Sequence, residues 1–230
     1  EALLKHDAKI AQVGRDEIDE QGNRRADICI PPTEEEVISA PAFFKELLMH
    51  RGDCSFCTKL IKRSLLNNYR FPIGELNEDF KTLIQMLGEV GEVVSLPKQA
   101  YHVFYRLGSN TRKKSKDDFS RVYADNVVNA GLALNLAKGR ETQPGYEALD
   151  IVSVAERFGL IQSLDYMLHI PISKMNRDNA MYQSVKKGIR KKVIQVLVNP
   201  YLDIKSRIYL LMFAVAPKLI RVLHSKLKGL

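Results

Sequence analysis

The stretch from Arg70 to Ile84, R-F-P-I-G-E-L-N-E-D-F-K-T-L-I, constrains the fold more than any other part of the sequence. Its Pro and Gly residues shape a loop, and Asn77 is a favourable N-cap residue for a helix. Glu78 and Asp79 fall in the first helical turn, where the helix dipole favours negative charge, and apolar residues then recur at helical spacing. The sequence therefore predicts a helix that begins with two adjacent carboxylates beside a loop.

Two interpretations of the paired carboxylates are open on the residues alone. Acidic residues in a first turn commonly serve stability, because they lie at the positive end of the helix dipole. A carboxylate at the mouth of a shaped loop also suits a general base that faces a substrate pocket. The spacing does not separate a stabilising pair from a catalytic one.

The segment from Lys59 to Phe80, K-L-I-K-R-S-L-L-N-N-Y-R-F-P-I-G-E-L-N-E-D-F, resembles the family-2 glycosyltransferases of GT-A type. The later half of such proteins typically runs K-L-Y-R-R-E-L-F, then R-F-P-E-G, then an E-D pair. The resemblance implies that Asp79 is the catalytic base of an inverting sugar transfer, with Glu78 supporting the start of the helix. It also implies that Lys59 and Asn77 bind the acceptor.

A second segment, R-L-G-S-N-T-R from Arg106 to Arg112, is similar to the R-x-G-S-I-T loop of the same family. Backbone amides around a glycine, with a nearby arginine, can cradle a diphosphate. The resemblance implies that Arg106 and Ser109 bind the diphosphate of the donor. A solvated turn is the alternative.

The resemblance also predicts the fold class and its limits. It implies an α/β fold, the C-terminal part of a GT-A (Rossmann-like) domain with a short mixed sheet, followed by a helical C-terminal region. We expect three parts: the acceptor-side catalytic part over 1–112, a helical extension over 113–182 and a basic amphipathic tail over 183–230. The family's nucleotide-binding half, with the D-x-D motif that holds Mg²⁺ or Mn²⁺, has no counterpart in the sequence. We therefore assign no metal ligand here, and expect Mg²⁺ or Mn²⁺ only in a longer enzyme.

Apolar periodicity and turn residues predict the remaining elements. Thr33 and Glu36 form a capping box, which predicts a helix from there to near Gly52. The expected strands are 9–18 and 24–30 as a hairpin, 55–61, 92–96 and 99–105. The expected helices are 62–67, one from about 115 to 139, 146–158 and 160–168.

Histidine and cysteine give no metal or disulfide pattern. His102 is a lone histidine in an aromatic strand, and such a residue is more often packed or exposed than a ligand. The three cysteines, Cys29, Cys54 and Cys57, fit a reducing compartment. Glu1 to Asp7 is charged and resembles the middle of a helix, so we expect no signal peptide there and a chain that continues upstream.

The positive charge is concentrated at the C-terminal end. Of the formal net charge of +8, residues 183–230 contribute eleven Lys and Arg against Asp203 alone, while the rest is nearly neutral. Ile208 to Ala216 is too short to cross a bilayer, which takes about 20 apolar residues. A helix with Lys218, Arg221, Ser225 and Lys228 on one face suits an anionic lipid surface. A helical hairpin packed on the protein's own core, with a solvated basic face, is the alternative.

These features predict part of a glycosyltransferase that moves a sugar from a nucleotide-sugar donor, such as a UDP-sugar, to a saccharide or lipid-linked acceptor. Such an enzyme would make cell-surface polysaccharide in the cytoplasm, at the inner face of the membrane. A non-catalytic membrane-docking or interaction module of the same fold is the alternative. We expect no nucleic-acid partner, because aromatic interleaving and recognition motifs are missing. A homodimer is a further expectation.

Overall fold

The computed structural model describes residues 1–105 and 119–228, with the side chain of Lys228 left out. The described chain has a mixed α/β fold and divides into two compact units. The first unit contains residues 1–105 and 140–150, and the second contains residues 119–139 and 151–228. The second unit thus joins most of the expected helical extension to the expected basic tail.

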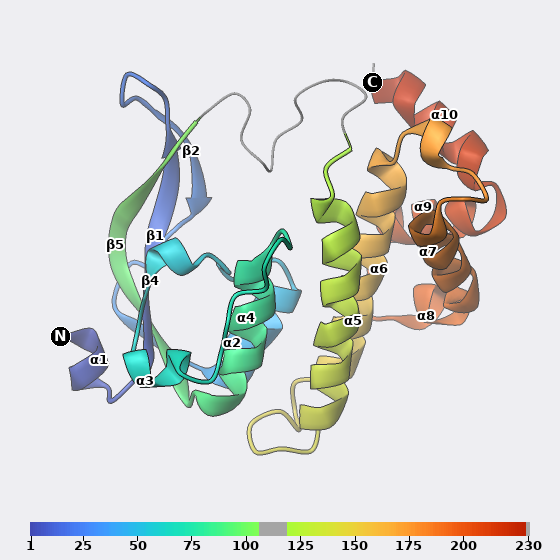
Figure 1. Cartoon of the computed structure of the whole chain (residues 1–230). Helices are drawn as coiled ribbons and strands as arrows, with labels where there is room; N and C mark the ends of the chain where they lie inside the picture. The colour runs from blue at the N-terminus through green and yellow to red at the C-terminus, as the bar shows by residue number, and fades with distance from the viewer. Residues whose placement is uncertain (106–118, 229–230) are drawn as a thin grey trace. The chain divides into compact units, whose positions relative to one another are not determined.

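The first unit contains a curled mixed sheet (Figure 1). Its strand order is β2-β1-β5-β3, and β4 pairs with the N-terminal end of β1. The strands β1 and β5 run parallel, and the other pairs are antiparallel. The strands are β1 (Ile10–Ile18), β2 (Arg24–Cys29), β3 (Glu36–Ser39), β4 (Lys59–Ile61) and β5 (Glu92–Phe104). The expectation of a mixed sheet followed by a helical region is confirmed.

The N-terminal hairpin is also confirmed. The strands β1 and β2 are joined by a turn in which Gly22 has a φ of 82° and the carboxylate of Asp19 accepts from the backbone N–H groups of Gln21 and Asn23. Short polar side chains and glycine specify such turns locally. The hairpin was therefore predictable from a few adjacent residues.

The expected pair of strands at 92–96 and 99–105 is wrong in one respect, because β5 is a single strand. It continues through Pro97, and its register against β1 shifts on either side of Gly14. Proline lacks the N–H that a regular ladder needs, and an irregularity in register accommodates it. The strand therefore changes register instead of ending.

The expected capping box at Thr33 and Glu36 is wrong as well. Residues 36–39 form β3, and α2 (Ala40–Leu48) begins only after Ser39, whose hydroxyl accepts from the N–H of Ala42 at 3.3 Å. Pro41 follows in the first turn, where its fixed φ suits a helix start. Pairing of β3 with β5 therefore overrides the local capping signal.

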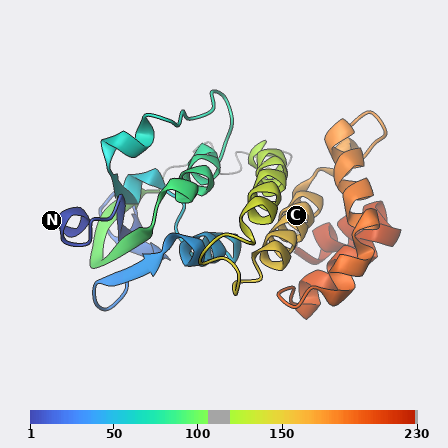
Figure 2. The same cartoon turned by 90° about the horizontal axis from the view of Figure 1, so that it is seen from below.

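Two helices, α2 and α4 (Glu78–Met86), pack on the same side of the sheet (Figures 1 and 2). Their apolar faces form the core of the unit with the inner face of the sheet. Fully buried members include Phe44, Leu48, Leu83, Ile84, Ile10 and Val93. The short elements are α1 (Ala2–Lys5), η1 (Phe56–Thr58), α3 (Arg63–Leu66) and η2 (Leu87–Glu89).

The second unit is helical. Its described elements are α5 (Val122–Arg140, whose last residue belongs to the first unit), α6 (Ile151–His169), η3 (Ile172–Lys174), α7 (Ala180–Lys191), α8 (Val193–Val198), α9 (Ile204–Val215) and α10 (Pro217–Lys228). Its core includes Tyr166, Met167, Leu210 and Phe213, so α9 packs on the body of the unit. No described helix has both the length and the apolar character required to cross a membrane.

Two expectations for the helical region are corrected. The expected helices 146–158 and 160–168 are one helix, α6, because Gly159 faces Ala130 of α5 across a close helix contact and does not interrupt α6. The expected basic face of the last helix, which was to meet an anionic lipid surface, fails at Arg221. Its side chain is buried, and its Nε donates to the carbonyl of Ile170 at 2.8 Å.

Candidate functional site

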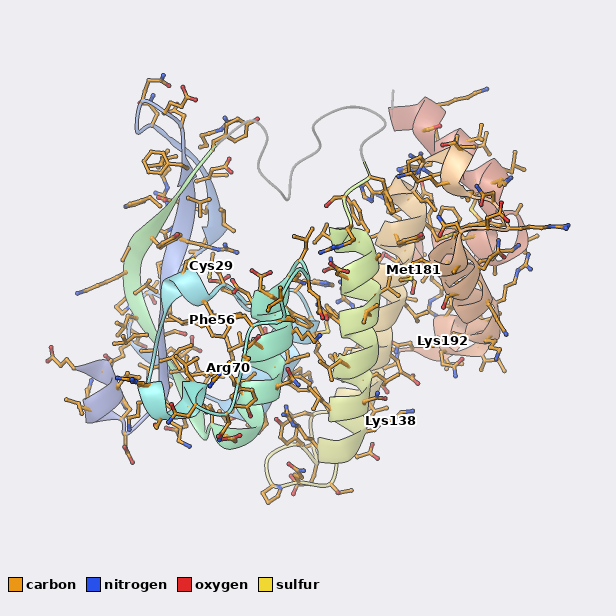
Figure 3. The ribbon with its side chains drawn as sticks, in the orientation of Figure 1. Cys29, Phe56, Arg70, Lys138, Met181 and Lys192 are labelled. Atoms are coloured by element: carbon orange, nitrogen blue, oxygen red, sulfur yellow. The ribbon has the colours of Figure 1, made fainter. Side chains whose placement is uncertain are left out.

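Asp79 lies in the first turn of α4 and is held by a segment 23 residues earlier in the chain. Its Oδ2 accepts a hydrogen bond from the backbone N–H of Phe56 at 3.1 Å. Figure 3 labels Phe56 in the segment between the sheet and α4. The helix start and the η1 turn therefore fix the carboxylate from two sides, while the side chain remains only half-buried.

An open cavity of about 530 Å³ adjoins this carboxylate. The lining residues are those of the loop before α4 together with the two acidic residues of its first turn: Phe71, Pro72, Ile73, Gly74, Glu75, Glu78 and Asp79. The ring of Phe71 packs edge-on against Phe56, with ring centroids 4.8 Å apart, and Lys81 bonds both carboxylate oxygens of Glu75. The loop that forms the cavity wall is thus attached both to η1 and to α4.

The electrostatic environment makes Asp79 a stronger base than an ordinary aspartate. Burial raises the pKa of its carboxyl, and the negative charges of Glu78 and Asp53 raise it further. The hydrogen bond from Phe56 and the charge of Lys59 act in the opposite direction but do not reverse the rise. A carboxylate with a raised pKa beside a cavity is the arrangement that general-base catalysis uses.

Lys59 lies behind this site and does not reach into the cavity. Its side chain is completely buried, and its Nζ donates to the carbonyls of Asp53 at 2.7 Å and Ser55 at 2.9 Å. Burial lowers the pKa of this ammonium group. The lysine therefore fixes the segment 53–58, which supplies the N–H of Phe56 to Asp79.

The carboxylate of Asp53 completes this buried network. Its Oδ1 lies 3.0 Å from Arg15, and its Oδ2 accepts from the hydroxyl of Thr58 at 2.6 Å and lies 3.8 Å from Lys59. Asp53 and Arg15 were not predicted to belong to the site. The N–H of Ser55 donates to Asp53, which is a local turn pattern that the Asp-x-Ser spacing could have indicated. The pairing with Arg15 on β1 has no such local signal.

Asn77 and Glu78 occupy the positions expected from the sequence, with one difference. Asn77 is the N-cap residue of α4, but its side chain makes no capping hydrogen bond, and its backbone has a left-handed φ of 60°. Asparagine tolerates that conformation better than most residues. Glu78 lines the cavity beside Asp79. Arg106 and Ser109, expected at the donor diphosphate, lie outside the described residues.

His102 is engaged within the sheet. Its Nδ1 lies 2.6 Å from Oδ1 of the buried Asp16, its neighbour across the β1–β5 pairing, and Arg24 is 3.4 Å from the other oxygen of Asp16. Within residues 1–105 and 119–228, no three His, Cys, Asp or Glu side chains gather in a way that could hold a metal ion. The described residues therefore provide no ligand set for the Mg²⁺ or Mn²⁺ that the sequence resemblance implies.

Comparison with known proteins adds no family to this description. The sequence matches no protein-family model, and no curated protein matches it significantly.

Proposed function

We propose that this chain is the acceptor-side part of an inverting glycosyltransferase of the family-2, GT-A type, with Asp79 as its catalytic base. One observation carries the proposal. A carboxylate of raised pKa, fixed by the N–H of Phe56, borders an open cavity at the position where the sequence resembles the family's E-D pair. The cavity is of the size that small-molecule sites use, about 300–1,000 Å³.

In the proposed reaction an acceptor hydroxyl enters the cavity and hydrogen-bonds to the carboxylate of Asp79. The hydroxyl oxygen attacks the anomeric carbon of the donor sugar while its proton passes to Asp79. The bond between the anomeric carbon and the phosphate oxygen breaks, and the nucleoside diphosphate leaves with the electron pair. Attack from the side opposite to the leaving group inverts the anomeric configuration.

The other residues have supporting roles in this proposal. Glu78 borders the acceptor and raises the pKa of Asp79 by its negative charge. Lys59 acts as a positioning residue through the segment 53–58, and Asn77 sets the backbone at the start of α4. Arg106 and Ser109 would bind the donor diphosphate. A divalent cation would neutralise that leaving group, with ligands from outside the described residues.

The proposed substrates are a nucleotide sugar, with UDP as the first candidate, and a saccharide or lipid-linked acceptor. The proposed place of action is the inner face of a membrane, where lipid-linked saccharides are assembled. Donor consumption tests this function. The protein as its gene encodes it, with any residues that precede Glu1, is incubated with UDP-sugars, Mg²⁺ or Mn²⁺ and a lipid-linked saccharide.

The proposed enzyme releases UDP and forms a product whose anomeric configuration, measured by proton NMR, is opposite to that of the donor. A product of retained configuration contradicts the inverting mechanism. The absence of UDP release with every donor, together with no heat of nucleotide binding, favours the non-catalytic docking module instead.

A further inference from the structure

The helix α9 carries a stripe of exposed apolar side chains. Its members recur at intervals of four, four and three residues and are between 40% and 80% exposed: Ile204, Ile208, Met212 and Val215. Such intervals place residues on one helix face. Leu210 and Phe213, which belong to the core of the unit, lie on the opposite face. The helix is therefore apolar on the side that faces solvent as well as on the side that packs.

The helix α10 repeats this pattern. Leu219, Leu223 and Leu227 recur at intervals of four residues and are between 46% and 81% exposed, whereas Arg221, about 160° away from this stripe, is buried. The exposed stripe of α10 is thus distinct from the face that packs on the unit.

The two stripes face the same side of the α9–α10 pair. Only Ala216 separates the helices, and the chain folds back so that the rings of Tyr209 and His224 meet edge-on at 5.8 Å. Tyr209 directly follows the stripe residue Ile208, and His224 directly follows the stripe residue Leu223. Each ring is therefore rotated about the helix axis by about 100° from its stripe residue. Because the helices fold back on each other, the same rotational offset directs both stripes to one side. We call these seven residues, 204, 208, 212, 215, 219, 223 and 227, the apolar ridge.

Positive charge borders the apolar ridge. The exposed lysines Lys205, Lys218 and Lys226 are each adjacent in sequence to a ridge residue. Asp203 is the sole acidic residue in 183–230, and its side chain caps α9 by accepting from the N–H of Ser206. Arg207 donates to the carbonyls of Asn199 and Leu202 and so serves the fold. Among the described side chains next to the ridge, the cations Lys205, Arg207, Lys218 and Lys226 thus outnumber the single carboxylate of Asp203.

We propose that the apolar ridge docks on an anionic phospholipid surface, with α9 and α10 lying parallel to the bilayer. Apolar side chains would enter the boundary of the acyl chains, while the long stems of the lysines would reach the phosphate groups. A second copy of the chain is a poorer occupant, because it would bring the lysine borders of both copies together. The proposal does not depend on the glycosyltransferase assignment, and it replaces the basic face expected from the sequence by a ridge that excludes Arg221.

A single tryptophan makes the ridge directly observable, because the chain has no tryptophan of its own. The full chain with Met212→Trp is mixed with vesicles of phosphatidylcholine alone or with 30 mol% phosphatidylglycerol, at low and high salt. Val128→Trp, at an exposed site on α5 of the same unit, is the matched control. Docking predicts a blue shift of Met212→Trp emission with anionic vesicles only, quenching by brominated lipid and weakening by salt.

Co-sedimentation with vesicles is the second test of the proposal. The double variant Ile208→Glu, Leu223→Glu replaces exposed residues, and circular dichroism checks that its helix content is retained. It should bind anionic vesicles at least tenfold more weakly than wild type, whereas Val128→Glu should bind as wild type does. Equal binding of wild type and the double variant overturns the proposal, as does a blue shift equal for the two tryptophan sites. A concentration-dependent dimer that Ile208→Glu abolishes, without vesicle binding, assigns the ridge to a second copy instead.

Discussion

The backbone N–H of Phe56 donates to Oδ2 of Asp79 at 3.1 Å, and this bond joins η1 to the first turn of α4. It holds a carboxylate at the edge of a cavity, although burial of that carboxylate disfavours its charged form. Structures commonly retain such a costly charge where it serves a function. The effect of this charge on the free energy of unfolding can therefore be measured by removing it.

Asp79→Asn should increase stability at neutral pH. The pKa of Asp79 is raised in the folded state, so its contribution to the free energy of unfolding is most favourable below its ordinary pKa of 3.8 and is lost as pH rises through the raised value. Asparagine removes the charge and keeps an oxygen for the N–H of Phe56. The gain at pH 7 should be at most about 1 kcal/mol, because solvent screens a half-exposed group.

Urea unfolding of both proteins at pH 7 and near pH 3 checks this. The difference should shrink at the lower pH, where both side chains are neutral. A variant that is less stable than wild type at pH 7 would show that the carboxylate serves the fold.

Lys59→Met should destabilise the first unit strongly. It would leave the carboxylate of Asp53 buried with one fewer positive neighbour, and two backbone carbonyls would lose their donor. Removing one partner of a buried ion pair costs about 3–5 kcal/mol. The shift in the urea midpoint of unfolding measures this loss of stability.

Lys62→Met is the matched control, three residues away. Lys62 bonds to the exposed Asp7 and should leave the midpoint almost unchanged. Similar effects of the two substitutions would mean that the buried network around Asp53 contributes nothing particular to the fold.

The start of α4 and the hairpin of β1 and β2 could be predicted because their signals are local. An acidic first turn after Asn77 and a turn around Gly22 each depend on residues a few positions apart. The position of Asp79 in the first turn of α4 followed from the same local pattern, whereas the cavity beside it was only one of two interpretations that the residues left open.

Features set by distant contacts could not be predicted in this way. Residues 36–39 form a strand because β5 pairs with them, and nothing next to Thr33 indicates that pairing. The burial of Lys59 likewise depends on its long-range packing and on the network in which Arg15 pairs with Asp53. Lysine side chains are exposed in most proteins, so the residue type alone predicts an exposed side chain for Lys59.

Gly14→Ala should destabilise the sheet where β1 and β5 change register. A Cβ at this position would lie 2.6 Å from Cδ of Pro31 and 2.8 Å from the carbonyl oxygen of Cys29. Overpacking of this kind costs about 1–3 kcal/mol. Gly91→Ala is the control, because no atom outside its own chain neighbours lies within 4 Å of its added Cβ. Thermal unfolding should separate the two variants, and equal midpoints would contradict the close packing at Gly14.

Arg140→Met should loosen the C-terminal end of α4. The guanidinium of Arg140 donates to the carbonyls of Ile84 at 3.0 Å and Gln85 at 3.1 Å, which lie near the end of that helix. Losing a charged donor to buried carbonyls costs about 1–3 kcal/mol. Hydrogen exchange of the α4 amides should accelerate in this variant. The same substitution at the exposed Lys138, labelled in Figure 3, should leave that exchange unchanged, and acceleration in both variants would contradict the role given to Arg140.

The central claim is that Asp79 removes a proton from a sugar hydroxyl, and the most direct test is the rate of sugar transfer by Asp79→Asn in the protein as its gene encodes it. General-base catalysis is worth about 10²–10⁴-fold, so we expect a loss of that size in kcat. Glu78→Gln, which keeps the base, should lose far less. Transfer by Asp79→Asn within a fewfold of wild type, in a variant that is as well folded, would contradict the account.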